Sequence, residues 1–518
     1  TSGYYIHQVY FHPLAKFPGP IVAKFSVIRG VYHAWKGDLH IDIWHCHDKY
    51  DFIGLKYFCV SVYLRCSGPV VRYGPNALLF NTASGHRGKS HNHLWRSLLN
   101  ENHRHIRFGK KYLEASTDFQ AKPEGSKSDH HFQDRVKEHI NTLISKVSQV
   151  GKQANESDAW GPPMDMSEWL RYFTFDAVSD FMFGFNYDLL NSAKHRHIIQ
   201  DIKDASVRNS VLVYQPLLRV FRADKMIFGK SVRGTRSFWK FIRAAISAQS
   251  GINRGDDVFT SLAGANCKSH EGLLSMTEIQ SEIGVLVIAG LDTTATAMCA
   301  LLFYLSKCRQ RYEKAANELR DVFNSVAEVR LGSQLESCKY FAACVKESLR
   351  ISPPIGSSPW REIGEGGETI DGHFIPEGYT VGTGLYSLHH NAAYFHNPHE
   401  FIPERWLNSD ESDTTGSNTK KSAFNPFSSG PRSCIGESLA YLELLLTIAS
   451  LLLVYDFRTP ERAYDELRAD LGTQKPGRGN SEEFQLIDRI FGLSKGPMLQ
   501  FRPRDILPKK EEANSAKF

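Results

Sequence analysis

A proline-free stretch from Thr277 to Cys308 limits the folds open to this chain more than any other feature. Ser275 and Glu278 have the spacing of a capping box, which marks the start of a helix. At about 1.5 Å per residue, the helix would be about 45 Å long. The part from Ile283 to Leu305 is almost wholly apolar, so the helix must lie in a protein core or in a membrane. The chain is therefore predicted to be built around one long central helix.

Polar residues at the middle of this helix favour the protein core over the membrane. Asp292 and the threonines beside it would be costly in lipid, although a transmembrane helix remains the competing interpretation. Buried threonine hydroxyls can bind the carbonyl four residues back, and Gly290 weakens the helix further. We therefore expect a local opening that holds water or dioxygen beside Asp292 and Thr293. The alternative for Asp292 is a buried carboxylate with its hydrogen bonds satisfied.

Composition restricts the class of protein. The chain has 518 residues, of which 42% are hydrophobic and 23% charged, and no segment resembles a long polar linker. The net charge is +6, but Lys and Arg are scattered, which argues against nucleic-acid binding and leaves a mildly basic face for an acidic redox partner. Nine cysteines without a Cys-x-x-Cys pair argue against a disulfide scaffold or a zinc ribbon.

The remaining patterns are mostly helical. Helices are expected over Met164–Ile246, over 275–350 and after Gly436, with a short strand at Val70–Tyr73, strands and turns over Pro353–Thr383 and a closing hairpin over Glu483–Phe501. No internal repeat is visible, so the fold is predicted to be mainly α with a small β region.

The segment from Phe427 to Gly436 delivers one cysteine to the start of an apolar helix. The free N–H groups and the dipole at a helix N-terminus stabilise a thiolate. Gly430 and Gly436 let the backbone approach a flat ligand, Arg432 can pair with an anionic substituent, and Phe427 can shield the sulfur. The alternative for Cys434 alone is a buried structural thiol.

The complete spacing Phe-x-x-Gly-x-Arg-x-Cys-x-Gly resembles the haem-binding signature of the cytochrome P450 family. The resemblance implies that Cys434 is the axial ligand of the haem iron and that Phe427, Arg432 and Gly436 contact the haem. A thiolate ligand favours O–O cleavage. The implied fold is the P450 fold, with haem b (iron-protoporphyrin IX) between the long central helix and the cysteine loop.

Three further motifs extend the resemblance. Ala289 to Thr294 resembles the oxygen-activating motif, which implies that Thr293 orients the oxygen intermediate and Asp292 relays protons. Glu347-x-x-Arg350 and Pro403-Glu-Arg405 resemble the motifs that form a buried triad of Glu347, Arg350 and Arg405, whose role is to hold the cysteine loop. Arg361 follows a proline-rich turn where the family often has a propionate-binding arginine.

The likeness covers nearly the whole chain. The segments Tyr10–Pro20 and Pro403–Leu407 resemble filamentous-fungal members of secondary metabolism, such as trichothecene hydroxylases. The expected domains are a remnant of a membrane-anchor region and hinge (1–19), the catalytic domain (20–505) and a loose tail (506–518). A membrane anchor is expected ahead of residue 1.

The implied activity is insertion of one atom of O2 into an apolar organic substrate. Electrons would come from NADPH through NADPH-cytochrome P450 reductase, with cytochrome b5 as a further candidate partner, and no nucleic acid is involved. The expected location is the endoplasmic reticulum membrane, with the catalytic domain facing the cytosol. The alternative is a haem-thiolate peroxygenase or rearranging enzyme.

Two segments depart from the family pattern. Phe52 to Ser67 interrupts a connection that is short in relatives, which suggests a translated intron or a tolerated surface insertion. The propionate-binding helix lacks its expected pair near Ser128-Asp129, and His103 and Arg107 have the spacing but occur early. These departures keep open a third possibility, a non-functional product of a wrong gene model.

Overall fold

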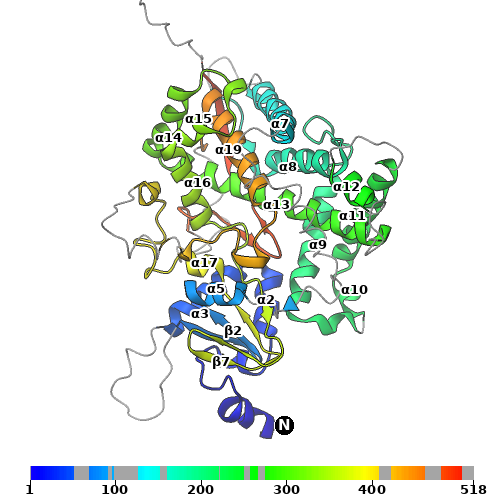
Figure 1. The fold of residues 1–518 in the computed structure, drawn as a ribbon, viewed down its shortest axis with the longest axis vertical. Helices are drawn as coiled ribbons and strands as arrows, with labels where there is room; N and C mark the ends of the chain where they lie inside the picture. The colour runs from blue at the N-terminus through cyan, green and yellow to red at the C-terminus, as the bar shows by residue number, and fades with distance from the viewer. Residues whose placement is uncertain are drawn as a thin grey trace, which may run out of the picture.

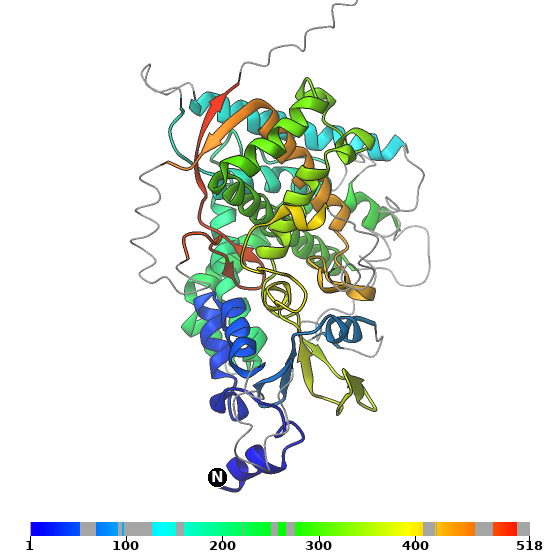
Figure 2. The ribbon, with the colours of Figure 1, turned by 90° about the vertical axis from the view of Figure 1, so that its left-hand side faces the viewer.

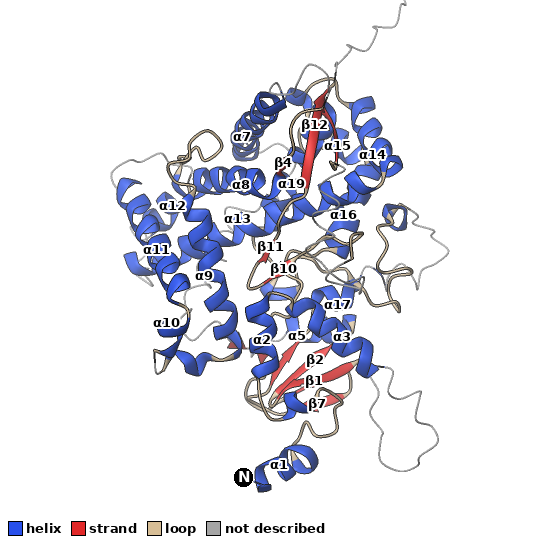
Figure 3. Ribbon diagram, turned by 180° about the vertical axis from the view of Figure 1, so that it is seen from behind, coloured by secondary structure: helices blue, strands red, loops and turns tan. Residues whose placement is uncertain are grey.

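A helical body and a smaller part that holds the largest sheet make up the described chain (Figure 1). The computed structural model describes residues 2–51, 69–91, 96–97, 127–151, 160–220, 222–249, 257–265, 275–407, 420, 422–460 and 480–504. Helices prevail and strands are short (Figure 3), which confirms the predicted mainly α fold with a small β region.

The α-helices are α1 (Ser2–Ile6), α2 (Ile28–Lys36), α3 (Leu39–Asp51), α5 (Ala83–His91), α7 (Lys127–Gly151), α8 (Met166–Phe183), α9 (His197–Tyr214), α10 (Ala223–Ile227), α11 (Gly229–Gln249), α12 (Val258–Ala265), α13 (Met276–Lys307), α14 (Arg309–Val322), α15 (Ser333–Ser337), α16 (Lys339–Ile351), α17 (Leu385–His389) and α19 (Glu437–Val454). The strands are β1 (Val70–Gly74), β2 (Ala77–Phe80), β3 (Arg96–Ser97), β4 (Met164–Asp165), β5 (Arg361–Glu362), β6 (Glu368–Ile370), β7 (His373–Ile375), β8 (Thr380–Gly382), β9 (Tyr455–Arg458), β10 (Ile487–Asp488), β11 (Gly492–Leu493) and β12 (Met498–Pro503).

Helix α13 runs through the centre of the helical body. Its predicted capping box is present, because the Ser275 hydroxyl accepts from the Glu278 N–H at 3.3 Å and the Glu278 carboxylate accepts from the Ser275 N–H. Its first half, up to Leu291, packs in a core with α8, α11 and α12, and its second half, from Ala295, packs with α7, α14, α16 and α19. Both α13 and α19 are long and apolar enough to span a membrane, but most of each is buried inside this chain. The core interpretation of α13 is therefore confirmed.

The five-stranded sheet has the order β1-β2-β8-β5-β3. Strands β1 and β2 form an antiparallel hairpin, and β2 pairs in parallel with β8 through Leu78 and Val381. Strand β5 then pairs with β8, which places Arg361 at Val381. The strands expected over Pro353–Thr383 are thus present: β5 and β8 belong to this sheet, and β6 and β7 form a separate two-stranded sheet.

The predicted closing hairpin is only partly correct. Strands β10 and β11 do form a small antiparallel pair. The following strand β12 instead pairs with β9 and β4, which lie far earlier in the chain, because its alternate residues Leu499 and Phe501 are buried in the core. Long-range pairing therefore replaces the expected local hairpin.

The N-terminal segment packs against the sheet rather than standing apart from it. Leu14 and Phe17 are buried in one cluster with Val70 and Leu78. The buried Arg72 guanidinium donates to the Gln8 carbonyl at 3.0 Å, and the Arg72 N–H donates to the Pro18 carbonyl at 2.7 Å. Residues 8–17 thus contact the sheet, and the domain boundary expected at residue 19 stays a prediction.

Helices α9 and α11 meet at a glycine, and this contact generates a test of the packing. A Cβ on Gly234 would lie 2.5 Å from the backbone oxygen of Asp201, which cannot move like a side chain. We expect Gly234→Ala to destabilise the fold by about 1–3 kcal/mol through overpacking. Urea unfolding measures the loss.

Gly229→Ala is the matched control in the same helix, because a Cβ there meets only the tip of Arg233, at 3.9 Å. It should leave stability unchanged or slightly higher. Equal losses in the two variants would contradict the close contact between α9 and α11.

Candidate active site

The cysteine loop makes a tight turn ahead of α19. Its 3-10 turn covers Gly430–Arg432, and Gly430 has a φ of +69°, which favours glycine. The Cys434 N–H donates to the Phe427 carbonyl at 2.8 Å, which closes the loop on itself. Gly436 is the N-cap of α19 with an ordinary φ of −91°, and a Cβ on it would meet no atom within 4 Å. The turn therefore requires glycine at 430, whereas Gly436 borders open space.

Cys434 presents an exposed thiol between the turn and the helix. The protein around the loop still desolvates the sulfur, and this burial raises the pKa of the Cys434 thiol, although the Gly436 N–H lowers it. The pKa of Cys434 is therefore raised overall, whereas the helix N-terminus was expected to lower it. Desolvation is the main cause, and the negative charge of Glu437, the first residue of α19, adds to it. The helix end alone does not make Cys434 a thiolate.

Thr293 lies half-buried on α13 between fully buried neighbours. Its hydroxyl donates to the Ala289 carbonyl at 2.6 Å, as expected. The helix nevertheless stays continuous, so the expected opening is not a break in α13. Two contacts brace this stretch: the Thr174 hydroxyl donates to the Leu291 carbonyl at 3.1 Å, and that of Thr296 donates to the Gly492 carbonyl at 2.8 Å.

Asp292 is buried and forms an ion pair with Arg171 of α8, whose Nε lies 3.3 Å from the carboxylate. Arg171 also donates to the carbonyls of Ser167 and Ser494, at 3.1 Å each. Burial raises the pKa of the Asp292 carboxyl, and the charges of Arg171 and Lys203 only partly offset that rise. Asp292 therefore takes up a proton more readily than an ordinary aspartate does.

The structure brings Glu347, Arg350 and Arg405 together, as the motifs suggested. Arg350 binds the Glu347 carboxylate through two nitrogens at 2.8 and 3.0 Å, and Arg405 Nε lies 3.0 Å from it. The Ile402 N–H and the Trp406 indole complete the shell at 2.9 and 2.8 Å. Burial alone would raise the pKa of Glu347, but these hydrogen bonds and positive charges hold it below its usual value.

His389 links this triad to the cysteine loop, and the sequence analysis did not identify it. Arg350 donates to the His389 carbonyl at 2.8 Å, and the His389 ring bridges the Arg350 carbonyl (Nδ1, 3.1 Å) and the Asn425 N–H (Nε2, 3.2 Å). The Asn425 carbonyl in turn accepts from the Ser428 N–H at 2.9 Å, next to Phe427. Burial, and then the charge of Arg350, lower the pKa of His389 to about 3. The ring is thus neutral, with its proton on Nδ1.

Two arginines lie close together near the cysteine loop without an acidic partner among the described residues. Arg361 on β5 donates to the Trp360 carbonyl at 3.0 Å, and Arg432 is exposed in the turn. Burial, and then the charge of Arg432, lower the pKa of Arg361 to about 10. An anionic group between the two guanidinium groups would relieve this repulsion. Together with the accessible Cys434 sulfur, this donor set fits a haem with its propionates.

The two departures from the family pattern stay untested. Residues 52–67 and the segment that contains His103 and Arg107 lie outside the described residues. Within the described residues, no cluster of three or more His, Cys, Asp or Glu side chains could hold a metal ion.

His389 generates a prediction about the loop. His389→Phe keeps a ring of similar shape but leaves the Asn425 N–H and the Arg350 carbonyl unpaired, each at a cost of about 1–3 kcal/mol. His389→Gln keeps an acceptor for the Asn425 N–H and should lose clearly less stability than His389→Phe. Urea unfolding of both variants measures the difference, and equal losses, or none, would contradict the proposed link.

Comparison with known proteins shows to which family the chain belongs. The family model for cytochrome P450 matches residues 93–477. Cytochrome P450 monooxygenase poxM of Penicillium oxalicum is 36% identical over 96% of this chain and 92% of the relative. The monooxygenase AKT7 of Alternaria alternata is 35% identical over 96% and 94%, and atnE of Emericella nidulans is 33% identical over 97% and 94%. The chain therefore belongs to the cytochrome P450 family of haem-thiolate monooxygenases.

Proposed function

We propose that Cys434 ligates the haem iron and that this chain oxidises an apolar small molecule of fungal secondary metabolism. The observation that carries the proposal is the cysteine loop, which fills every position of the haem-binding signature and is tied through His389 to the buried Glu347 triad. The fungal monooxygenases that match nearly the full chain support the same conclusion.

A bound haem would supply an iron at which O2, two electrons and two protons put one oxygen atom into the substrate and release the other as water. Arg361 and Arg432 would hold the two propionates, because each offers a guanidinium without an acidic partner among the described residues. Phe427 would shield the sulfur, while its ring rests on Tyr441 with centroids 5.0 Å apart.

Asp292 and Thr293 would manage protons. The raised pKa of Asp292 would let it take up a proton and pass it on, while Arg171 stabilises its ionised form between transfers. The Thr293 hydroxyl is held by the Ala289 carbonyl at 2.6 Å, so its oxygen stays free to accept a hydrogen bond at a fixed place. This pair favours O2 chemistry over the peroxygenase or rearranging alternative.

The redox partner would be NADPH-cytochrome P450 reductase, with cytochrome b5 as an additional donor. The net charge of +6 suits docking to an acidic partner. Supply of electrons by a redox partner is a property of the family.

Large apolar side chains are exposed on two segments, and they support membrane contact. The first segment begins at the end of the molecule that carries the N-terminus (Figure 2). These segments are the N-terminal region through α2 and the chain from η4 (Pro216–Arg219) through α10, and α2 packs against α9. Exposed basic residues are interleaved with them, as in surfaces that bind anionic lipid. The exposed apolar residues are Tyr4, Tyr5, Ile6, Tyr10, Phe11, Ile21, Val22, Ile28, Tyr32, Trp35, Leu217, Val220, Met226 and Ile227. The proposed location is the cytosolic face of the endoplasmic reticulum membrane, and this exposed apolar surface supports contact with a membrane.

The function is tested by turnover under ¹⁸O₂ with NADPH and reductase, using an apolar compound that shifts the Soret band. The product should carry one ¹⁸O atom. Thr293→Ala should lower the product formed per NADPH roughly tenfold, equivalent to about 1.4 kcal/mol, with hydrogen peroxide formed instead.

Thr293→Ser is the matched control, because it keeps the hydroxyl and should restore most of the coupling. A product without ¹⁸O, or turnover driven by peroxide alone, would contradict the monooxygenase. Equal coupling in the alanine and serine variants would remove Thr293 from the mechanism.

A further inference from the structure

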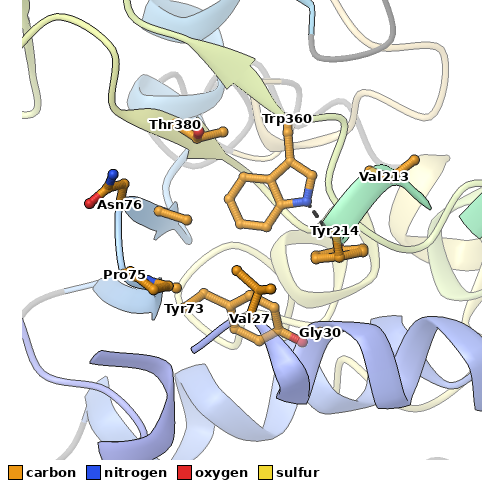
Figure 4. A pocket seen from close by; sticks show the side chains of 11 residues that line it. Val27, Gly30, Tyr73, Pro75, Asn76, Val213, Tyr214, Trp360 and Thr380 are labelled. Carbon is orange, nitrogen blue, oxygen red and sulfur yellow. Dashed lines mark hydrogen bonds between the residues drawn. The ribbon is translucent and has the colours of Figure 1, made fainter. Parts of the chain in front are cut away.

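A cavity lies in the part of the molecule that holds the sheet, between α2, the β1–β2 turn, the end of α9 and the start of β5 (Figure 4). Its volume is about 140 Å³. Among the described residues that line it none is charged, and its walls are mainly apolar. The residues that form these walls include Val27, Tyr73, Ala77, Val213, Tyr214 and Trp360.

Three aromatic rings form one continuous wall. The Tyr73 and Trp360 rings are stacked with centroids 6.0 Å apart, and the Tyr214 ring meets Trp360 edge-on at 6.2 Å. Their polar atoms are already occupied. The Tyr73 hydroxyl donates to Asp42 at 2.7 Å, and the Trp360 indole N–H donates to the Tyr214 hydroxyl at 2.9 Å, as Figure 4 shows. The ring faces that remain offer apolar contact, so water would gain few hydrogen bonds there.

The close contact between α2 and α9 helps to keep the pocket open. Gly30 on α2 lies so close to α9 that a Cβ there would be 2.5 Å from the Tyr214 ring. The pocket also reaches the surface, because Asn76 at its rim is exposed and Pro75 and Ala77 are half-buried. Figure 4 shows Asn76 and Thr380 together at one side, away from Tyr214 and Val213. A ligand can therefore enter past a polar rim toward an apolar interior.

We propose that this pocket is a second binding site, separate from the haem site, for a small neutral apolar molecule of the size of one aromatic ring. A cavity of about 150 Å³ with apolar walls is large enough to take up benzene. The absence of lining charges disfavours an ionic ligand. Trp360 immediately precedes Arg361, so an occupant would lie beside the strand that carries the candidate propionate arginine. Binding here does not depend on Cys434 or on the proposed oxidation.

The test uses the haem-loaded protein labelled with 5-fluorotryptophan and benzene as the probe. The chain has eight tryptophans, and Trp360→Phe identifies the fluorine resonance of Trp360 by its loss. Benzene should shift that resonance in a saturable way. Ala77→Leu, which fills the pocket, should abolish the shift, and Ala392→Leu, the same change at an exposed position, should preserve it.

An unmoved Trp360 resonance up to the solubility limit of benzene would overturn the proposal. So would an equal shift in Ala77→Leu, or a change confined to the Soret band, which would place benzene at the haem instead. A shift with phosphatidylcholine vesicles but none with benzene would overturn it in favour of a lipid acyl chain. The wild-type and Trp360→Phe spectra decide the outcome even if Ala77→Leu fails to fold.

Discussion

The buried carboxylate of Glu347 is the constraint on which the active-site side of the structure depends. A carboxylate that is fully removed from water must be paired and hydrogen-bonded, and five donor groups meet that need here. Three of them, from Ile402, Arg405 and Trp406, come from outside the Glu347 turn, so satisfying one charge fixes the path of the segment between α17 and η6 (Pro403–Trp406). Removing one partner of such a pair typically costs about 3–5 kcal/mol. The hydrogen bonds of His389 to Arg350 and Asn425 connect the cysteine loop to this fixed segment.

Helix α13 meets a different demand, because it must fill two cores and still carry polar groups at its middle. The apolar residues on either side of Asp292 belong to separate clusters. The carboxylate between them is tolerated because Arg171 pairs with it and because Arg171 is itself held by two carbonyls. The free-energy cost of burying the Asp292 carboxylate is thus offset by a second buried charge, that of Arg171. Its place next to Thr293 gives the helix a chemical role in addition to its packing role.

Features that depend on local chemistry could be predicted from the sequence. The start of α13 follows from the capping box at Ser275, and its expected span from Thr277 to Cys308 agrees with the observed helix within one residue. The Glu347 triad joins distant residues, but the resemblance of its two motifs to the family pattern predicted it. Long-range contacts that no family motif marks could not be predicted. Neither the bond of His389 to Asn425 nor the ion pair of Arg171 with Asp292 leaves a signal in residue spacing. The prediction of a closing hairpin failed for the same reason, because a hairpin pattern does not reveal that β12 pairs with the distant β9.

The measurement that tests the central claim most directly is the carbon monoxide difference spectrum of the reduced, haem-loaded protein. A thiolate from Cys434 donates electron density to the iron and should give a strongly red-shifted Soret band. An imidazole-like band, or a purified protein that does not retain haem, would contradict the assignment of Cys434 as the axial ligand.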